Sequence, residues 1–345
     1  MNTLSVDRLI TGLLGIRLGM NQDSRGRDAD KPGEIPLRGV KDVVRRVRTE
    51  AKADNVPLLS AGVAFYSLLA LIPGLGAVIS IYGLVAKPAS VRQQVISSLS
   101  AAPKEARDLV AAQLTSIASS SHGSTVIAVT IGVVLALWTA STGVAHLMQA
   151  INIAYDEQDE RGFVRRRAIA LLFTVGATLM LAASFVVIAV LPAWLANTGL
   201  GLAARVTASL LRWMLLLAVM IAALAVLYRY TPDRDEPKWR WVSTGAAVAA
   251  VVWVIGSIAF SVYTANFAKY NKTYGSLGAV VVLMLWLYLT SLAIILGAEI
   301  NAELERQTVK DTTTGPAQPI GQRNADAADT IGLTTSDQTA NTARR

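Results

Sequence analysis

The sequence predicts an all-α fold, a polytopic membrane helix bundle with six transmembrane helices. Hydrophobic residues make up 53% of the 345 residues, charged residues only 16%, and the mean hydropathy is +0.45. A helix of about twenty apolar residues spans a hydrocarbon core of about 30 Å, and period-two alternation, typical of barrel strands, is absent from the apolar stretches. Six nearly uncharged stretches are long enough: Leu58–Ala86, Ser124–Met148, Ala168–Leu195, Leu210–Tyr230, Trp241–Ala265 and Leu277–Ile300.

The distribution of Lys and Arg predicts the orientation of this bundle. Of the 32 Lys and Arg residues, 24 lie before the first stretch, in the second and fourth connections, or after the sixth stretch. The other three connections share the remaining 8. Because Lys and Arg are retained on the cytoplasmic side, we expect both termini to be cytoplasmic. The net charge of +8 then indicates topology and attraction to anionic lipids rather than nucleic-acid binding.

Composition divides the chain into four parts. We expect residues 1–39 to be a largely disordered cytoplasmic segment and residues 307–345 to be a disordered cytoplasmic tail, because both have little to bury. Residues 40–57 are predicted to form a basic amphipathic juxtamembrane helix. Residues 58–306 are predicted to hold the six spans, with an external amphipathic connection at 87–123.

The juxtamembrane helix has one apolar and one basic face. Four valines recur at i, i+3, i+4 and i+7, a pattern typical of an amphipathic helix on a membrane surface. We expect its basic side to contact the anionic inner leaflet, although a solvated helix packed on cytoplasmic loops fits the pattern equally well. The apolar residues are Val40, Val43, Val44 and Val47, and the basic residues are Lys41, Arg45, Arg46 and Arg48.

The first span contains the sequence Pro73-Gly74 in its middle. Proline removes a helix hydrogen bond and clashes with the preceding turn, so we expect the span to be kinked or broken there. Discontinuous helices build substrate sites in transporters, whereas simple kinks at proline are ordinary in transmembrane helices. Both interpretations are open from the sequence.

Ionisable and amide residues near the ends of spans are candidates for transport or gating. Glu299 and Glu303 are four residues apart and therefore share one helix face, where they could pair with Arg165–Arg167 or Lys41–Arg48. The alternative is a pair of boundary carboxylates that only hold helices together. His146 is expected at a helix–helix contact, with a proton relay as the alternative, and Asn152 joins the candidate set.

The chain shows no pattern of an enzyme. Cysteine is absent and the two histidines lack the spacing of a zinc site or of a two-metal nuclease. There is no Gly-rich phosphate loop with lysine and no Gly-x-Ser-x-Gly nucleophile elbow. We therefore expect no catalytic residues, no metal and no cofactor.

The chain resembles the YihY/BrkB family of bacterial inner-membrane proteins over about residues 40–305. The resemblance implies a six-helix inner-membrane protein with cytoplasmic termini. Members have carried the label ribonuclease BN, and others are associated with serum resistance or with export of envelope lipid and lipopolysaccharide. The blocks that carry it include Ala64–Pro73, Leu137–Ala140, Tyr230–Pro232, Phe260–Tyr263, Tyr270–Gly278, Trp286–Tyr288 and Leu296–Ala302.

These observations favour a transporter or flippase of a lipid-like envelope component. A non-transporting membrane scaffold for envelope integrity is the alternative, and a membrane-bound hydrolase or nuclease is a minor one. The candidate transport or gating residues are Pro73, Gly74, His146, Asn152, Tyr274, Gly275, Glu299, Asn301 and Glu303.

Overall fold

The computed structural model describes residues 24–85, 126–185, 187–188, 201–267 and 276–334. Over these residues the fold is helical, apart from a single antiparallel bridge between Pro237 and Thr313. Besides a one-turn 3-10 helix, η1 (Pro32–Glu34), the elements are α2 (Leu37–Ala53), α3 (Val56–Val85), α6 (Val126–Ala154), α7 (Phe163–Phe185), α9 (Leu202–Tyr230), α10 (Trp239–Phe267), α12 (Ser276–Glu305) and α13 (Asp326–Asp329).

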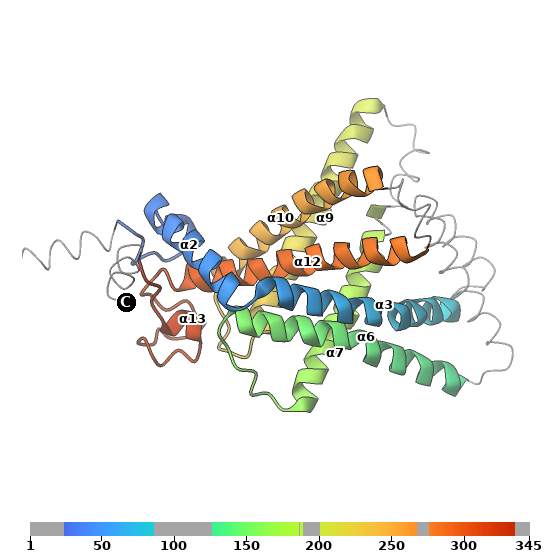
Figure 1. The fold of residues 1–345 in the computed structure, drawn as a ribbon, viewed down its shortest axis with the longest axis horizontal. Helices are drawn as coiled ribbons and strands as arrows, with labels where there is room; N and C mark the ends of the chain where they lie inside the picture. Colours follow the sequence, from blue (N-terminus) through green and yellow to red (C-terminus); the bar gives the residue numbers. More distant parts are fainter. Residues whose placement is uncertain (1–23, 86–125, 186, 189–200, 268–275, 335–345) are drawn as a thin grey trace, which may run out of the picture.

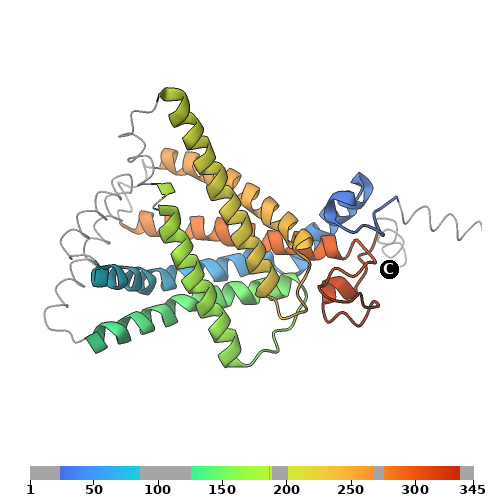
Figure 2. The ribbon, with the colours of Figure 1, turned by 180° about the vertical axis from the view of Figure 1, so that it is seen from behind.

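Helix α12 lies at the centre of the bundle. It packs against α3 on one side and α10 on the other, α6 lies beyond α3, and α2 and α13 contact its C-terminal half (Figure 1). Helices α7 and α9 pack on α6 and α10 and lie on one side of this row (Figure 2). The long helices diverge away from the end where α2 and α13 lie, which we call the polar end.

Three described helices are long and apolar enough to cross a membrane: Ala203–Tyr230, Trp239–Thr264 and Val280–Glu305. A fourth candidate is the pair α2 and Val56–Ala70, bent by 61° at the break between them. The first three predicted spans each include residues outside the described part, so the count of six stays a prediction. Large apolar side chains such as Leu210, Met214 and Ile255 are exposed on α9 and α10, as expected of a lipid-facing surface.

Small residues let α10 approach α12 closely. A Cβ at Gly245 would lie 2.2 Å from the Gly297 carbonyl oxygen, and one at Gly297 would lie 2.3 Å from Tyr228 Oη. Ala246 and Ala249 are fully or almost fully buried in the same contact. Close approach through small residues is a common way for membrane helices to associate, because the gain in packing does not depend on a hydrophobic effect.

Two sequence-based expectations are wrong. Helix α3 continues without interruption through Pro73 and Gly74, so the first span is not broken there, since proline removes only one backbone bond and a long helix can absorb the loss. A kink at that point stays a prediction. Residues 24–39 and 307–334 are folded rather than disordered, with Ala327, Thr312 and Gln307 fully buried.

Other expectations fall partly or wholly outside the described residues. The predicted juxtamembrane helix corresponds to α2, which begins at Leu37 and ends at Ala53, before a turn that contains Asn55 with a φ of 53°. Residues 1–23, 86–125, 268–275 and 335–345 are not described, so the external connection at 87–123 is untested.

Candidate functional site

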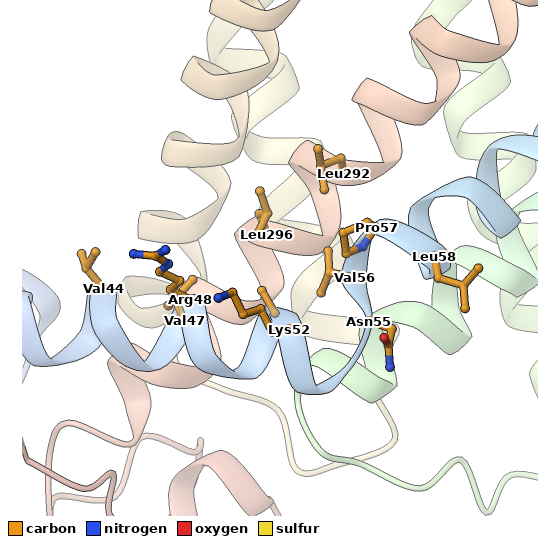
Figure 3. Close-up of a pocket in the computed structure, with 11 residues that line it drawn as sticks. Val44, Val47, Arg48, Lys52, Asn55, Val56, Pro57, Leu58, Leu292 and Leu296 are labelled. Atoms are coloured by element: carbon orange, nitrogen blue, oxygen red, sulfur yellow. The ribbon is translucent and has the colours of Figure 1, made fainter. Parts of the chain in front are cut away.

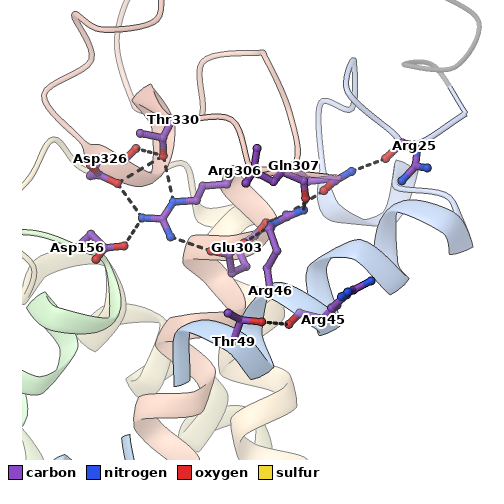
Figure 4. Close-up of polar contacts among 12 residues, drawn as sticks. Arg25, Arg45, Arg46, Thr49, Asp156, Glu303, Arg306, Gln307, Asp326 and Thr330 are labelled. Carbon is purple, nitrogen blue, oxygen red and sulfur yellow. Dashed lines mark hydrogen bonds and ion pairs between the residues drawn. The ribbon is translucent and has the colours of Figure 1, made fainter. Parts of the chain in front are cut away.

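A network of charged side chains joins the segments at the polar end of the bundle, and the buried Arg306 is its centre. The Arg306 guanidinium donates to Glu303 Oε1 at 2.8 Å, to Asp326 Oδ1 at 2.7 Å and to Asp156 Oδ2 at 2.5 Å (Figure 4). Burial opposes its charge, but these carboxylates more than offset burial and raise the pKa of Arg306. One side chain thus ties α12 to the end of α6 and to α13.

Arg46 approaches the same glutamate from α2. Its Nε donates to Glu303 Oε2, and its Nη2 donates to the Glu303 carbonyl oxygen and to Gln307 Oε1, both at 2.9 Å. The two side chains of the ion pair are only 5% and 1% exposed. The expected pairing of Glu303 with the segment Lys41–Arg48 is therefore confirmed. The expectation that Arg46 contacts the lipid leaflet is wrong, because its guanidinium is buried in the protein.

A second ion pair lies wholly inside the polar end. Arg234 donates to both carboxylate oxygens of Glu305, at 2.7 and 3.3 Å, and neither side chain is exposed. Thr312 Oγ1 adds a bond of 2.6 Å to Glu305, and the Arg234 guanidinium lies 5.1 Å from the centre of the Tyr155 ring. Burial opposes the charge of Arg234, but Glu305 more than offsets it and raises the pKa of Arg234. An ion pair whose charged atoms all have hydrogen-bond partners holds the segment after α9 in one position against the end of α12.

Glu299 is the one candidate carboxyl in these described segments that keeps an unpaired oxygen. Its side chain is buried, and its Oε1 has no hydrogen-bond partner among the described residues. Asp54 lies beside it, in the turn between α2 and α3, and burial raises the pKa of Asp54. Asp54 is half-buried, and two carboxyl groups side by side in such surroundings disfavour two negative charges.

An apolar groove opens next to this pair, between α2, the start of α3 and α12. It has a volume of about 650 Å³ (Figure 3). Leu292 and Leu296 of α12 lie on the helix face that also carries Glu299 and Glu303, because these positions recur at i, i+4, i+7 and i+11. Two cations, Arg48 and Lys52, belong to its lining. The other lining residues are Val44, Val47, Ala51, Asn55, Val56, Pro57 and Leu58.

The predicted amide residues hold backbone segments in place. Asn301 Oδ1 accepts from the Gly245 N–H at 2.7 Å, and its Nδ2 donates to the Val242 carbonyl at 3.2 Å, so it joins α12 to α10. Asn152 Oδ1 accepts from the Asp233 N–H at 2.8 Å and fixes the connection after α9. Both side chains are buried and hydrogen-bonded to backbone groups, as expected of residues that hold neighbouring segments in position.

The remaining predicted residues do not join this cluster. His146 of α6 stacks on Tyr66 of α3, with ring centres 3.6 Å apart, and so lies at the expected helix–helix contact. Tyr274 and Gly275 lie outside the described residues. Within the described ranges no three His, Cys, Asp or Glu side chains are grouped so that they could hold a metal ion.

Sequence reasoning missed Arg306, Asp156, Asp326 and the pair Arg234–Glu305. One signal was available, because Arg306 follows Glu303 by three residues and therefore shares its helix face. Asp326 lies in the segment that the sequence predicts to be a disordered tail. Asp156 has a φ of 56° in a turn, a conformation that the sequence does not indicate except by the residue type. Long-range pairs of this kind leave no local pattern.

Comparisons with known proteins identify the family. The model of the family described as virulence factor BrkB matches residues 47–321. The chain belongs to the BrkB family. The matched range includes the groove residues from Val47 onward and most of the ion network, but neither Arg46 nor Asp326. No solved structure matches the chain.

Relatives of the BrkB-family chain include proteins named as membrane proteins. A UPF0761 membrane protein of Rhodospirillum centenum is 27% identical over 85% of this chain and 64% of its own length. One of Alteromonas mediterranea is 27% identical over 73% of this chain and 84% of its own length. The ribonuclease-like protein YfkH of Bacillus subtilis is 34% identical over 51% of this chain and 65% of its own length. Together with its apolar helices, these matches make the chain a multi-pass membrane protein.

Proposed function

We propose that this BrkB-family protein is a transporter or flippase for a lipid-like component of the bacterial envelope. The observation that carries the proposal is the groove whose α12 face continues to Glu299, a buried carboxyl with an unpaired oxygen. An amphiphile needs apolar surface for its chain and polar groups for its head, and this arrangement offers both within a few helical turns. Glu299 and Glu303 are the proposed gating residues, with Asn152 and Asn301 holding the surrounding backbone.

The proposal places the chain in the inner membrane with both termini in the cytoplasm. The absence of cysteine makes this directly testable, since single cysteines can be introduced without a background. Asp28→Cys and Gln322→Cys lie at exposed positions of the polar end. We expect a membrane-impermeant maleimide added to intact spheroplasts to label His122→Cys but to label the other two only after lysis. If the reagent labelled Asp28→Cys or Gln322→Cys in intact spheroplasts, the orientation would be the opposite of the proposed one.

The transport function is tested in proteoliposomes that contain a headgroup-labelled lipid. Wild type is expected to move the label between leaflets faster than protein-free vesicles do. Glu299→Gln keeps the size of the side chain but removes its charge, and we expect it to insert normally and to lose most of this activity. Glu160→Gln is the matched control, because Glu160 is exposed in the connection after α6. Equal rates in wild type and Glu299→Gln would count against the proposed role of the groove.

A membrane scaffold is the second candidate function, favoured by the ion pairs of the polar end. They join α2, the end of α6, the connection after α9 and the segment that contains α13 to the C-terminal end of α12, as a docking platform requires. A scaffold predicts a stable partner in mild detergent that is lost in the Lys41→Gln/Arg45→Gln variant. It also predicts that Glu299→Gln leaves envelope integrity unchanged. We propose no catalytic activity: the purified protein should not cleave RNA with or without divalent metal ions.

A further inference from the structure

Helix α2 carries a stripe of basic residues on the side away from its buried face. They follow the spacing i, i+4, i+7 and i+11, which places them along one line of the helix surface. All four side chains are exposed, and none forms an ion pair with the described residues. Arg46, by contrast, points inward to Glu303. The stripe consists of Lys41, Arg45, Arg48 and Lys52.

Only half of this stripe reaches the groove. Arg48 and Lys52 belong to the groove lining, whereas Lys41 and Arg45 do not. Figure 3 shows Arg48 and Lys52 on the side of α2 that faces Leu296, with Val56 and Pro57 at the start of α3 beyond them. The 61° bend between α2 and α3 opens this angle. Two cations without an ion pair among the described residues thus lie at the edge of a largely apolar surface.

The surroundings of the groove favour a lipid over a soluble ligand. Two of its lining residues, Leu58 and Val44, are 72% and 62% exposed. Exposed apolar side chains beside an amphipathic basic helix are typical of a helix that lies in the interface of a membrane. The groove therefore opens where acyl chains and phosphate head groups meet.

We infer that the groove binds one molecule of an acidic phospholipid. Arg48 and Lys52 hold its phosphate, because both are full cations without a protein partner in the described part of the chain, and Leu292 and Leu296 contact an acyl chain. The negative head group gives the site a preference over zwitterionic lipids of the same chain length. The inference rests on the proposed membrane placement and names the substrate class of the proposed carrier.

The test is native mass spectrometry of purified full-length protein released from nanodiscs that contain equal amounts of phosphatidylglycerol and phosphatidylcholine. Four proteins are compared. They are wild type, Arg48→Gln/Lys52→Gln, the control Lys41→Gln/Arg45→Gln, which removes two charges from the same helix outside the groove, and Leu292→Trp, which fills the groove and keeps its charges. All substituted positions are partly or fully exposed, and thermal unfolding in detergent verifies that each variant is folded.

We expect wild type and the control to retain one phosphatidylglycerol in preference to phosphatidylcholine. Arg48→Gln/Lys52→Gln should lose this preference by tenfold or more, and Leu292→Trp should lose the bound lipid itself. Equal retention in all four proteins, or loss in the control as large as in the groove variant, would overturn the inference. If the protein retained phosphatidylglycerol but did not move lipid in proteoliposomes, the proposed carrier function would be refuted and the inferred lipid-binding site would be supported.

Discussion

Arg46 of α2 and Glu303 of α12 form a buried ion pair between residues that are 257 positions apart in the sequence. Arg306 contacts the second oxygen of the same glutamate, at 2.8 Å, so one carboxylate is shared by two cations. This relationship fixes α2 against the central helix.

Replacing Arg46 by glutamine should destabilise the protein strongly. The change leaves Glu303 with one cation in a dry environment, and loss of one partner of a buried pair costs about 3 kcal/mol or more. Arg45→Gln is the matched control, because Arg45 is exposed on the same helix and should change stability by less than about 0.5 kcal/mol. Thermal unfolding in detergent measures both. Similar midpoints for the two variants would contradict the role given to the pair.

Replacing Arg306 by glutamine should release the segment after α12. Arg323 lies in that segment and is only 4% exposed, so trypsin should cleave poorly after it in wild type. Without the bonds from Arg306 to Asp326 and Asp156, we expect faster cleavage after Arg323. Lys310→Gln removes an exposed pair with Asp30 and is the control. Unchanged cleavage in Arg306→Gln would show that other contacts hold the segment.

Gly245→Ala should loosen the contact between α10 and α12. The added Cβ would lie 2.2 Å from the Gly297 carbonyl and 2.4 Å from Asn301 Oδ1, so backbone must move, at a cost of about 1–3 kcal/mol. Gly256→Ala in the same helix meets nothing within 4 Å and should be neutral or slightly stabilising. The unfolding midpoint of Gly245→Ala is expected below those of wild type and Gly256→Ala. If Gly245→Ala unfolded at the wild-type midpoint, the close approach would be unnecessary.

Glu157 should make stability depend on pH. Burial raises its pKa to about 7 from an ordinary 4.5, although its Oε1 accepts the Asp326 N–H at 2.8 Å. The folded protein therefore binds this proton more tightly than the unfolded chain does, and wild-type stability falls as pH rises from about 4.5 to 7. The side chain is partly exposed, so solvent screening reduces the effect to about 1 kcal/mol.

Glu157→Gln removes this titration. Its unfolding midpoint relative to wild type should therefore rise between pH 5 and pH 8, whatever its value at pH 5. Glu160→Gln, at an exposed position, should run parallel to wild type over the same range. Parallel curves for Glu157→Gln and wild type would place the titrating group elsewhere.

The length of the apolar stretches predicts the long helices well, but the sequence predicts the charged contacts poorly. The six apolar stretches correspond to α3, α6, α7, α9, α10 and α12, because burial and lipid exposure both require long apolar runs. Residue type alone places Arg46 on the basic side of α2, toward the anionic leaflet. Arg46 nevertheless lies on the same helix face as Val43 and Glu50, and its partner is distant in sequence.

The segment after α12 is a second case in which amino-acid composition does not predict the structure. It has few large apolar residues, and so it was expected to be disordered. It folds instead through polar contacts with backbone groups: Arg323 donates to the carbonyls of Val309 and Ala328, and Thr308 donates to those of Arg27 and Ala29. Hydrogen bonds of this kind depend on three-dimensional placement, which hydropathy does not encode.

We propose that the groove and Glu299 move an amphiphile, and the rate at which labelled phosphatidylglycerol changes leaflet in proteoliposomes tests this proposal. We predict that wild type exceeds protein-free vesicles and that Glu299→Gln, inserted to the same level, is slower than wild type by tenfold or more. Equal rates in wild-type and protein-free vesicles would contradict the claim and leave the scaffold as the better description of the protein.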